Sequence, residues 1–66
     1  MVDVRTLKPF DIIQNHEDGF LKDEYGIVNY SDGECAVATF IKAPEYEYII
    51  GIWNCNYIDL VEEFNN

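Results

Sequence analysis

Two runs of β-branched and aromatic residues, at positions 25–30 and 35–41, dominate the hydrophobic pattern of the chain. Such side chains pack well on a pleated, half-buried surface and are typical of β-strands. The segment between them contains the Asp32-Gly33 step, and glycine accepts the positive φ of a tight turn without steric cost. The pattern therefore predicts a β-hairpin over residues 25–41, with the rest of the chain covering it.

Shorter apolar and polar runs precede this hairpin. Residues 10–14 follow Pro9 and are expected to form a first strand, because proline is tolerated where no ladder N–H is needed. Residues 15–24 are polar and exceed the usual hairpin loop, so they predict a long excursion anchored by Phe20 and Leu21. Long loops on a rigid sheet often carry function.

After the hairpin, Pro44 predicts a connection at residues 43–45, because proline cannot donate to a ladder. Residues 46–53 then alternate as a further strand, and Gly51 is expected to mark a bulge or a close backbone approach. One face of this strand is expected to carry Tyr46, Tyr48, Ile50 and Ile52, and the other Glu47 and Ile49.

The last eleven residues, 56–66, fit two structures. Asn56 is a suitable N-cap for a helix, and apolar residues follow it at the i, i+3, i+4 and i+7 spacing of a helix face. The favoured alternative is a single turn over residues 56–58 and a closing strand over residues 59–63, which would cover a sheet edge. The chain is thus predicted to be one domain of mainly β class, with a short helical turn or helix near the C-terminus.

Charge and composition narrow the classes of function. Thirteen acidic and four basic residues give a net charge of −9, so the domain is repelled from phosphate backbones and anionic membranes and is steered toward basic partners. The chain is 48% hydrophobic, which predicts a compact fold. No apolar run is long enough to span a membrane and the N-terminus lacks the pattern of a secretory signal, so a cytoplasmic protein is expected.

Little in the sequence points to catalysis or to a cofactor. Cys35 and Cys55 lie outside any Cys-x-x-Cys pair, and one histidine cannot complete a zinc set with them. Free thiols are expected, with an intramolecular disulfide as the alternative. His16 beside Glu17 and Asp18 is either a pH-sensitive group or an ordinary surface histidine. We expect no metal, no cofactor and no enzymatic activity.

Acidic and aromatic side chains together predict a surface that binds a partner protein. A domain of this size cannot bury all its aromatic side chains, and Tyr and Trp are enriched at protein interfaces. The candidate partner-binding residues are Glu17, Asp18, Asp23, Glu24, Glu45, Tyr46, Glu47, Tyr48, Trp53, Tyr57, Asp59, Glu62 and Glu63.

The order of the predicted elements resembles that of small SH3-like barrels, of the KOW and Tudor-like kinds that phages often encode. The matching pieces are residues 7–13, the long loop, residues 24–28, the Asp32-Gly33 turn, residues 36–40 and residues 57–62. The resemblance implies a five-stranded, partly open barrel. It also implies an aromatic face able to grip proline-rich segments or methylated basic side chains. The chain departs from the KOW pattern at Phe10, which precedes Asp11 where a glycine is usual.

Two classes of function follow as expectations. The first is a non-enzymatic interaction module that docks on a basic surface of a partner protein. In its extended form this is a phage or mobile-element inhibitor that mimics nucleic-acid charge, and the partner is then a nucleic-acid-binding enzyme. The alternative is a KOW-like module that binds nucleic acid through exposed aromatics, or a small structural subunit of a larger assembly. Direct binding of nucleic acid and of membranes is not expected from the charge.

Overall fold

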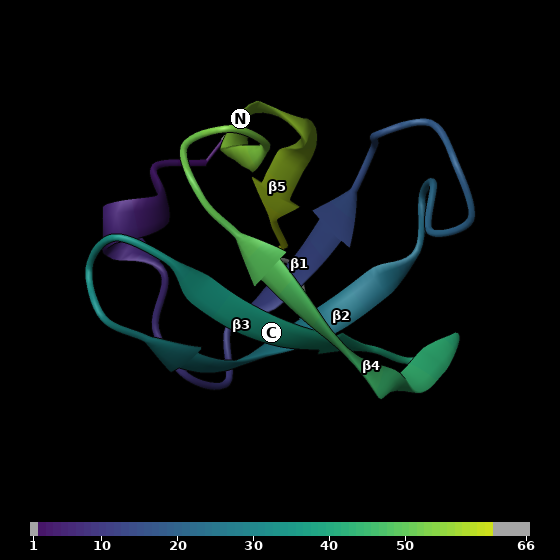
Figure 1. The fold of residues 1–66 in the computed structure, drawn as a ribbon, viewed down its shortest axis with the longest axis horizontal. Coiled ribbons are helices and arrows are strands. Elements are labelled where there is room, and N and C mark those ends of the chain that lie inside the picture. Colours follow the sequence, from purple (N-terminus) through teal and green to yellow (C-terminus); the bar gives the residue numbers. More distant parts are fainter. Residues whose placement is uncertain (1, 62–66) are drawn as a thin grey trace.

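The computed structural model describes residues 2–61, which form one antiparallel sheet of five strands (Figure 1). The elements in chain order are η1 (Val4–Thr6), β1 (Ile12–Asn15), β2 (Tyr25–Ser31), β3 (Ala36–Phe40), β4 (Ala43–Ile50), η2 (Cys55–Tyr57) and β5 (Ile58–Leu60). The strands follow the order β4-β3-β2-β1-β5, and β4 and β5 do not pair, so the sheet is not closed. The predicted mainly β class is confirmed.

The core lies on the inner face of this curved sheet. Strand β3 alternates strictly between buried and half-buried positions, as the period-2 geometry of a strand requires. The largest fully buried side chains come from all five strands: Phe40, Ile13, Ile50, Ile58 and Val28. Val2, Val4 and Leu7 from the N-terminal segment pack against them. None of the helical elements within residues 2–61 has the length and apolar character to cross a membrane.

The predicted hairpin is confirmed as β2 and β3. Its turn is held by Asp32, whose Oδ1 accepts hydrogen bonds at 2.9 Å from the backbone N–H groups of Cys35 and Glu34. These two bonds, that from Cys35 first, lower the pKa of Asp32. Gly33 takes a φ of +91°, which supports the prediction that glycine is needed there.

The connection predicted at residues 43–45 is wrong. Residues 41–42 make the turn, and Pro44 lies inside β4. Strand β4 is an edge strand with β3 on one side only, so a proline whose nitrogen faces away from β3 removes no hydrogen bond from the ladder.

The predicted alternation over residues 46–53 holds only over residues 48–50, because Tyr46 and Glu47 are both exposed and β4 ends at Ile50. Gly51 donates to Oδ1 of Asn54 at 2.8 Å and starts a turn that leaves Ile52 82% exposed, so the predicted placement of Ile52 on one face with the buried Ile50 is wrong. The close approach expected at Gly51 is confirmed, since a Cβ there would lie 2.1 Å from Cζ3 of Trp53.

The first strand starts later than predicted, at Ile12, because Phe10 has a left-handed φ of +76°. Phe10 N–H nevertheless donates to the Val28 carbonyl at 2.7 Å, and Val28 N–H donates to the Asp11 carbonyl at 2.9 Å. Phe10 and Asp11 therefore both oppose Val28, which is the geometry of a bulge whose first residue is usually glycine.

The long loop and the C-terminal region are partly as predicted. Leu21 packs against the core, whereas Phe20 is 60% exposed, so only one of the two expected anchors is confirmed. Residues 55–60 form a short helical turn and a strand that pairs with β1. The favoured alternative, a turn followed by a closing strand, is therefore confirmed for the described residues, and the alternative helix is wrong there. The part of the predicted closing strand at Glu62 and Glu63 lies outside the described residues.

Candidate functional site

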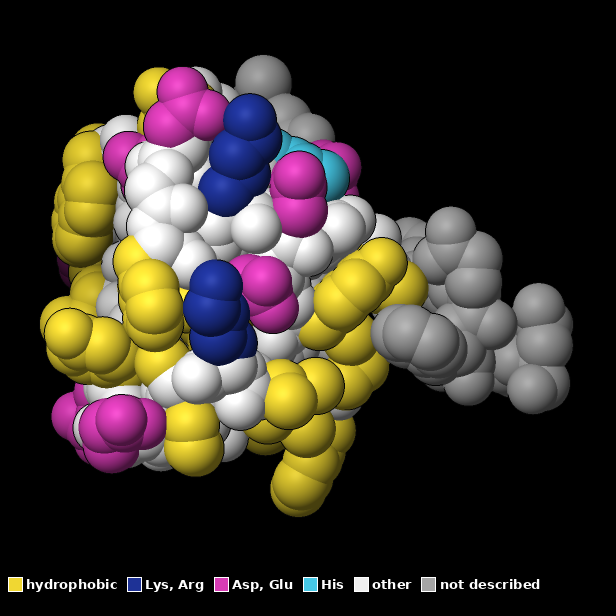
Figure 2. Space-filling view, turned by 90° about the vertical axis from the view of Figure 1, so that its right-hand side faces the viewer, with side chains coloured by type: hydrophobic (Ala, Val, Ile, Leu, Met, Phe, Trp, Pro, Cys, Tyr) yellow, Lys and Arg dark blue, Asp and Glu magenta, His cyan; other side chains and the backbone are white. Residues whose placement is uncertain are grey.

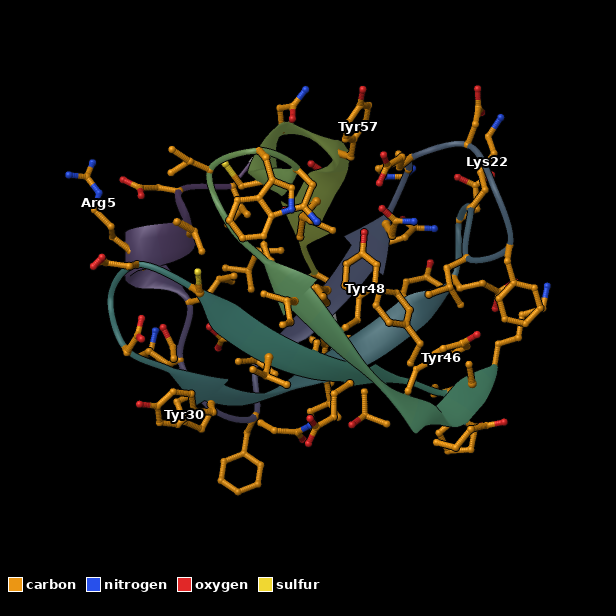
Figure 3. The ribbon with its side chains drawn as sticks, viewed as in Figure 1. Arg5, Lys22, Tyr30, Tyr46, Tyr48 and Tyr57 are labelled. Atoms are coloured by element: carbon orange, nitrogen blue, oxygen red, sulfur yellow. The ribbon has the colours of Figure 1, made fainter. Side chains whose placement is uncertain are left out.

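A groove of about 290 Å³ lies between β4 and the β1–β2 loop, which comprises residues 16–24. Aromatic and acidic side chains line it together, and we call it the aromatic-acidic groove. Its lining residues are Asn15, Glu17, Asp18, Phe20, Leu21, Tyr46, Glu47 and Tyr48. Figure 3 shows the positions of Tyr46 and Tyr48 along β4.

An irregularity in β4 carries Tyr46 and Glu47 to this groove. Ala38 pairs with Tyr48, but the next pair is Phe40 with Ala43, so residues 44–47 of β4 oppose Thr39 alone. These residues therefore leave the regular ladder with β3. Bulges of this kind often redirect side chains at binding sites.

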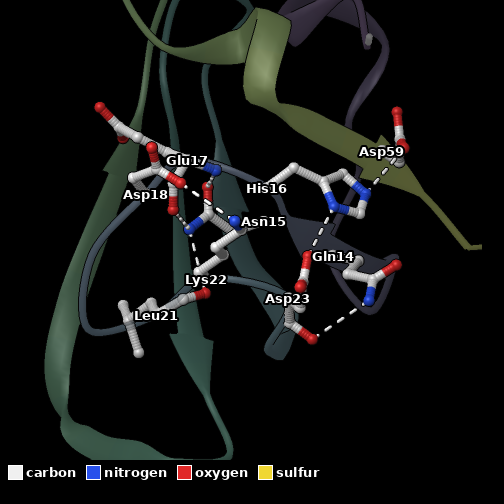
Figure 4. A network of polar contacts seen from close by, with 9 residues as sticks. All are labelled: Gln14, Asn15, His16, Glu17, Asp18, Leu21, Lys22, Asp23 and Asp59. Carbon is white, nitrogen blue, oxygen red and sulfur yellow. Dashed lines mark hydrogen bonds and ion pairs between the residues drawn. The ribbon is translucent and has the colours of Figure 1, made fainter.

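The opposite wall of the groove is held by Asn15, which is only 2% exposed. Its Nδ2 donates to the Leu21 carbonyl at 3.0 Å, and its Oδ1 accepts from the Glu17 N–H at 3.2 Å (Figure 4). Within the same network, Gln14 Nε2 donates to the Asp23 carbonyl at 3.1 Å. The backbone of the β1–β2 loop is therefore tied to the end of β1 from inside.

A second buried asparagine supports the β4 side. Asn54 Nδ2 donates to the Ile49 carbonyl at 3.1 Å and to the Tyr48 hydroxyl at 3.4 Å. Sequence reasoning missed both Asn15 and Asn54. Their signal was weak, because asparagine next to a strand end is common in any turn.

Tyr48 links the two walls. Its ring meets Phe40 edge-on with centroids 5.0 Å apart, and its hydroxyl donates to Glu17 Oε1 at 3.5 Å. Burial is the main cause that raises the pKa of Tyr48. The phenol therefore stays neutral and offers a fixed donor and an aromatic face to the groove.

The cationic side chains of the described residues are already paired with carboxylates. The ion pairs are Arg5–Asp3 at 2.9 Å, Lys8–Asp11 at 4.0 Å, Lys22–Asp18 at 3.1 Å and Lys42–Glu24 at 3.9 Å. On the face seen in Figure 2, basic side chains lie beside carboxylates. Within residues 2–61, Glu17 and Glu47 have no ion-pair partner, although both line the groove.

The rim of the groove already holds an ammonium group of the chain itself. Lys42 Nζ lies 4.7 Å from the centroid of the Phe20 ring and donates to the Phe20 carbonyl at 3.2 Å. This is the geometry of a cation–π contact. Phe20 thus contributes one ring face to a cation while also lining the groove.

Of the predicted partner-binding residues, the structure brings five together in the groove: Glu17, Asp18, Tyr46, Glu47 and Tyr48. It places the others elsewhere. Asp23 and Asp59 flank His16, Glu24 pairs with Lys42, and Glu45 and Tyr57 are exposed outside the groove. Glu62 and Glu63 lie outside the described residues.

Trp53 belongs to a separate groove of about 510 Å³, lined also by Ile52, Cys35 and Cys55. Both cysteines are free thiols, as expected. Across residues 2–61, no three His, Cys, Asp or Glu side chains are placed to hold a metal ion together.

Comparison of the chain with protein-family models, with curated proteins and with solved structures finds no match.

Proposed function

We propose that the protein is a non-enzymatic interaction module that binds a basic segment of a partner protein and receives a Lys or Arg side chain in the aromatic-acidic groove. One observation carries the proposal: Glu17 and Glu47 stand beside Tyr46 and Tyr48 without a cation from the described residues. A ligand cation would supply the missing charge.

The chemistry of the groove matches a long basic side chain. Its aliphatic stem would lie along Leu21 and the tyrosine rings, and its charged end would face the carboxylates. Cation–π attraction contributes about 0.5–1 kcal/mol at an exposed site, so one anchored side chain gives weak binding. The net charge of −9 would add steering of a basic partner toward the domain.

The proposal includes an SH3-like, partly open barrel architecture. Two observations support it: the strand order β4-β3-β2-β1-β5, and the left-handed backbone at Phe10, where KOW-type domains usually carry glycine. It assigns no catalytic step, and it places the protein in the cytoplasm, where free thiols stay reduced.

Mimicry of nucleic-acid charge is the narrower form of the same proposal, with a nucleic-acid-binding enzyme of a phage-infected host as the partner. Direct binding of nucleic acid is disfavoured, because each Lys and Arg among residues 2–61 already pairs with a carboxylate.

Binding of a fluorescent peptide of alternating lysine and glycine, followed by anisotropy, tests the proposal. The double variant Tyr46→Ala/Glu47→Gln removes one ring and one charge from the groove. Its matched control is Tyr30→Ala/Glu34→Gln, because Tyr30 and Tyr46 are 57% and 59% exposed and both variants lose one charge.

We expect the groove variant to weaken binding about tenfold and the control less than about threefold, since about 1.4 kcal/mol corresponds to a tenfold change. Equal losses in both variants would show that only the overall charge attracts the peptide, and the groove would not be the site. Absence of binding by the unmodified protein at low salt would refute the proposal itself.

A further inference from the structure

His16 lies at the start of the β1–β2 loop and contacts carboxylates with both nitrogens of its ring (Figure 4). Nδ1 is 3.0 Å from Asp23 Oδ1 in the same loop, and Nε2 is 3.0 Å from Asp59 Oδ2 in β5. The backbone N–H of His16 also donates to the Tyr57 carbonyl at 2.8 Å. The ring therefore bridges two segments that are distant in sequence.

The two contacts require a particular protonation state. An ionised carboxylate only accepts hydrogen bonds, and a neutral imidazole has a single N–H, so only the imidazolium can donate to both groups. A neutral ring would turn a nitrogen lone pair toward one carboxylate oxygen. Within residues 2–61, the charged groups that contact the ring are Asp23 and Asp59, while Glu17 follows His16 directly and Lys22 is held by Asp18.

We propose that His16 is a pH-controlled latch, which in its protonated form fastens the β1–β2 loop to β5 and in its neutral form releases the outer side of the loop. Asn15 would keep the inner side of the loop in place in both states. Asp23 adopts a left-handed φ of +64°, a conformation that is uncommon for residues other than glycine and that Asp adopts more readily than most. The contact with His16 is one of the interactions that hold Asp23 in this conformation.

The latch regulates the aromatic-acidic groove, because the same loop supplies Glu17, Asp18, Phe20 and Leu21 to its wall. This consequence rests on the proposed function. Fastening the loop preforms the groove, so affinity for a basic peptide should rise as the pH falls from 8 to 5.5. The charge of the imidazolium alone would repel a basic peptide and give the opposite sign.

Hydrogen exchange of the loop amides tests the latch without any ligand. The Asp23 N–H, which donates to the Asn15 carbonyl at 2.6 Å, reports on the closed loop, and the Val37 amide in β3 serves as the reference. Relative to Val37 and after correction for intrinsic exchange, we expect protection of Asp23 to rise about two- to fivefold from pH 8 to pH 5.5, the effect of an exposed ion pair.

Two variants separate the latch from other titrating groups. His16→Gln should lower the protection and make it independent of pH, whereas His16→Arg keeps a permanent cation between the carboxylates and should keep protection high at every pH. A flat profile for the unmodified protein, or the same profile in His16→Gln, would overturn the latch.

Peptide binding across the same pH range then distinguishes the two proposals. If the exchange profile is as expected and no lysine-glycine peptide binds at any pH, the latch is supported and the proposed function fails. If the peptide binds and its affinity falls with falling pH, the latch does not regulate the groove.

Discussion

Replacing Asn15 with alanine should lower the free energy of unfolding by about 2–3 kcal/mol. The side chain is 2% exposed, and it makes one hydrogen bond to the Leu21 carbonyl and one from the Glu17 N–H, at 3.0 and 3.2 Å. Each bond contributes about 1 kcal/mol, and a partner left buried and unpaired adds to the loss. Leu21 and Glu17 are half-buried, so water would reach them in part and limit that addition.

The expected loss is large for so small a domain. A chain of 66 residues has a total stability of about 3–10 kcal/mol. Urea unfolding followed by far-UV circular dichroism would show the change as a midpoint lower by roughly 2–3 M, for a denaturant slope near 1 kcal/mol per M. The variant should also weaken peptide binding, because the loop that Asn15 holds forms one wall of the aromatic-acidic groove.

Asn29→Ala is the matched control for this experiment. Asn29 donates to the Thr39 hydroxyl at 2.6 Å, but it lies on the exposed side of β2, where water can replace that bond. We expect its removal to change stability by less than about 0.5 kcal/mol. Equal losses for Asn15→Ala and Asn29→Ala would refute the reasoning, because they would show that burial does not set the contribution of these side chains.

Three further substitutions test other features of the fold. Gly51→Ala should displace the Trp53 indole, because the new Cβ would lie 2.1 Å from the ring. We expect an altered near-UV circular dichroism signal of the tryptophan and a free energy of unfolding lower by about 1 kcal/mol. An unchanged spectrum would contradict the close approach. Phe10→Gly should raise the free energy of unfolding by up to about 1 kcal/mol, because glycine adopts the left-handed φ of this position without strain and the Phe10 side chain is 82% exposed. Phe10→Ala keeps the strained left-handed backbone and should bring no gain. The backbone amides of the β2–β3 turn lower the pKa of Asp32 below its ordinary value of 3.8, so the ionised carboxylate stabilises the fold above about pH 4 and this contribution disappears as the pH falls through the lowered pKa. In acid unfolding, Asp32→Asn should lose that part of the pH dependence of stability. An unchanged pH dependence in the variant would refute the role of Asp32.

Local chemistry explains how much of the fold could be predicted. The Asp32-Gly33 step located the central turn because its requirement for a positive φ is met within the turn itself. The prediction at Pro44 was wrong because the effect of this proline depends on residues outside its own segment. A missing N–H weakens a sheet only where a strand lies on the side that it faces, and the edge position of β4, with β3 on one side only, is a property of the whole sheet.

The candidate site shows the same division. The sequence identified Tyr46, Glu47 and Tyr48 as unusual, and it singled out the acidic loop that contains Glu17. It did not separate Trp53 from them, although the turn that begins at Gly51 sends the indole to a different groove.

The sequence by itself determined the β class, the central hairpin, the acidic balance and the supply of aromatic side chains, because each depends on residue type or on neighbours along the chain. Only the tertiary structure decided which of these residues meet. Glu17 and Tyr48 come into contact across 31 positions, through the bulge that lifts residues 44–47 and the loop that Asn15 ties to β1. Contacts between such distant positions depend on register and loop closure, which no local pattern encodes.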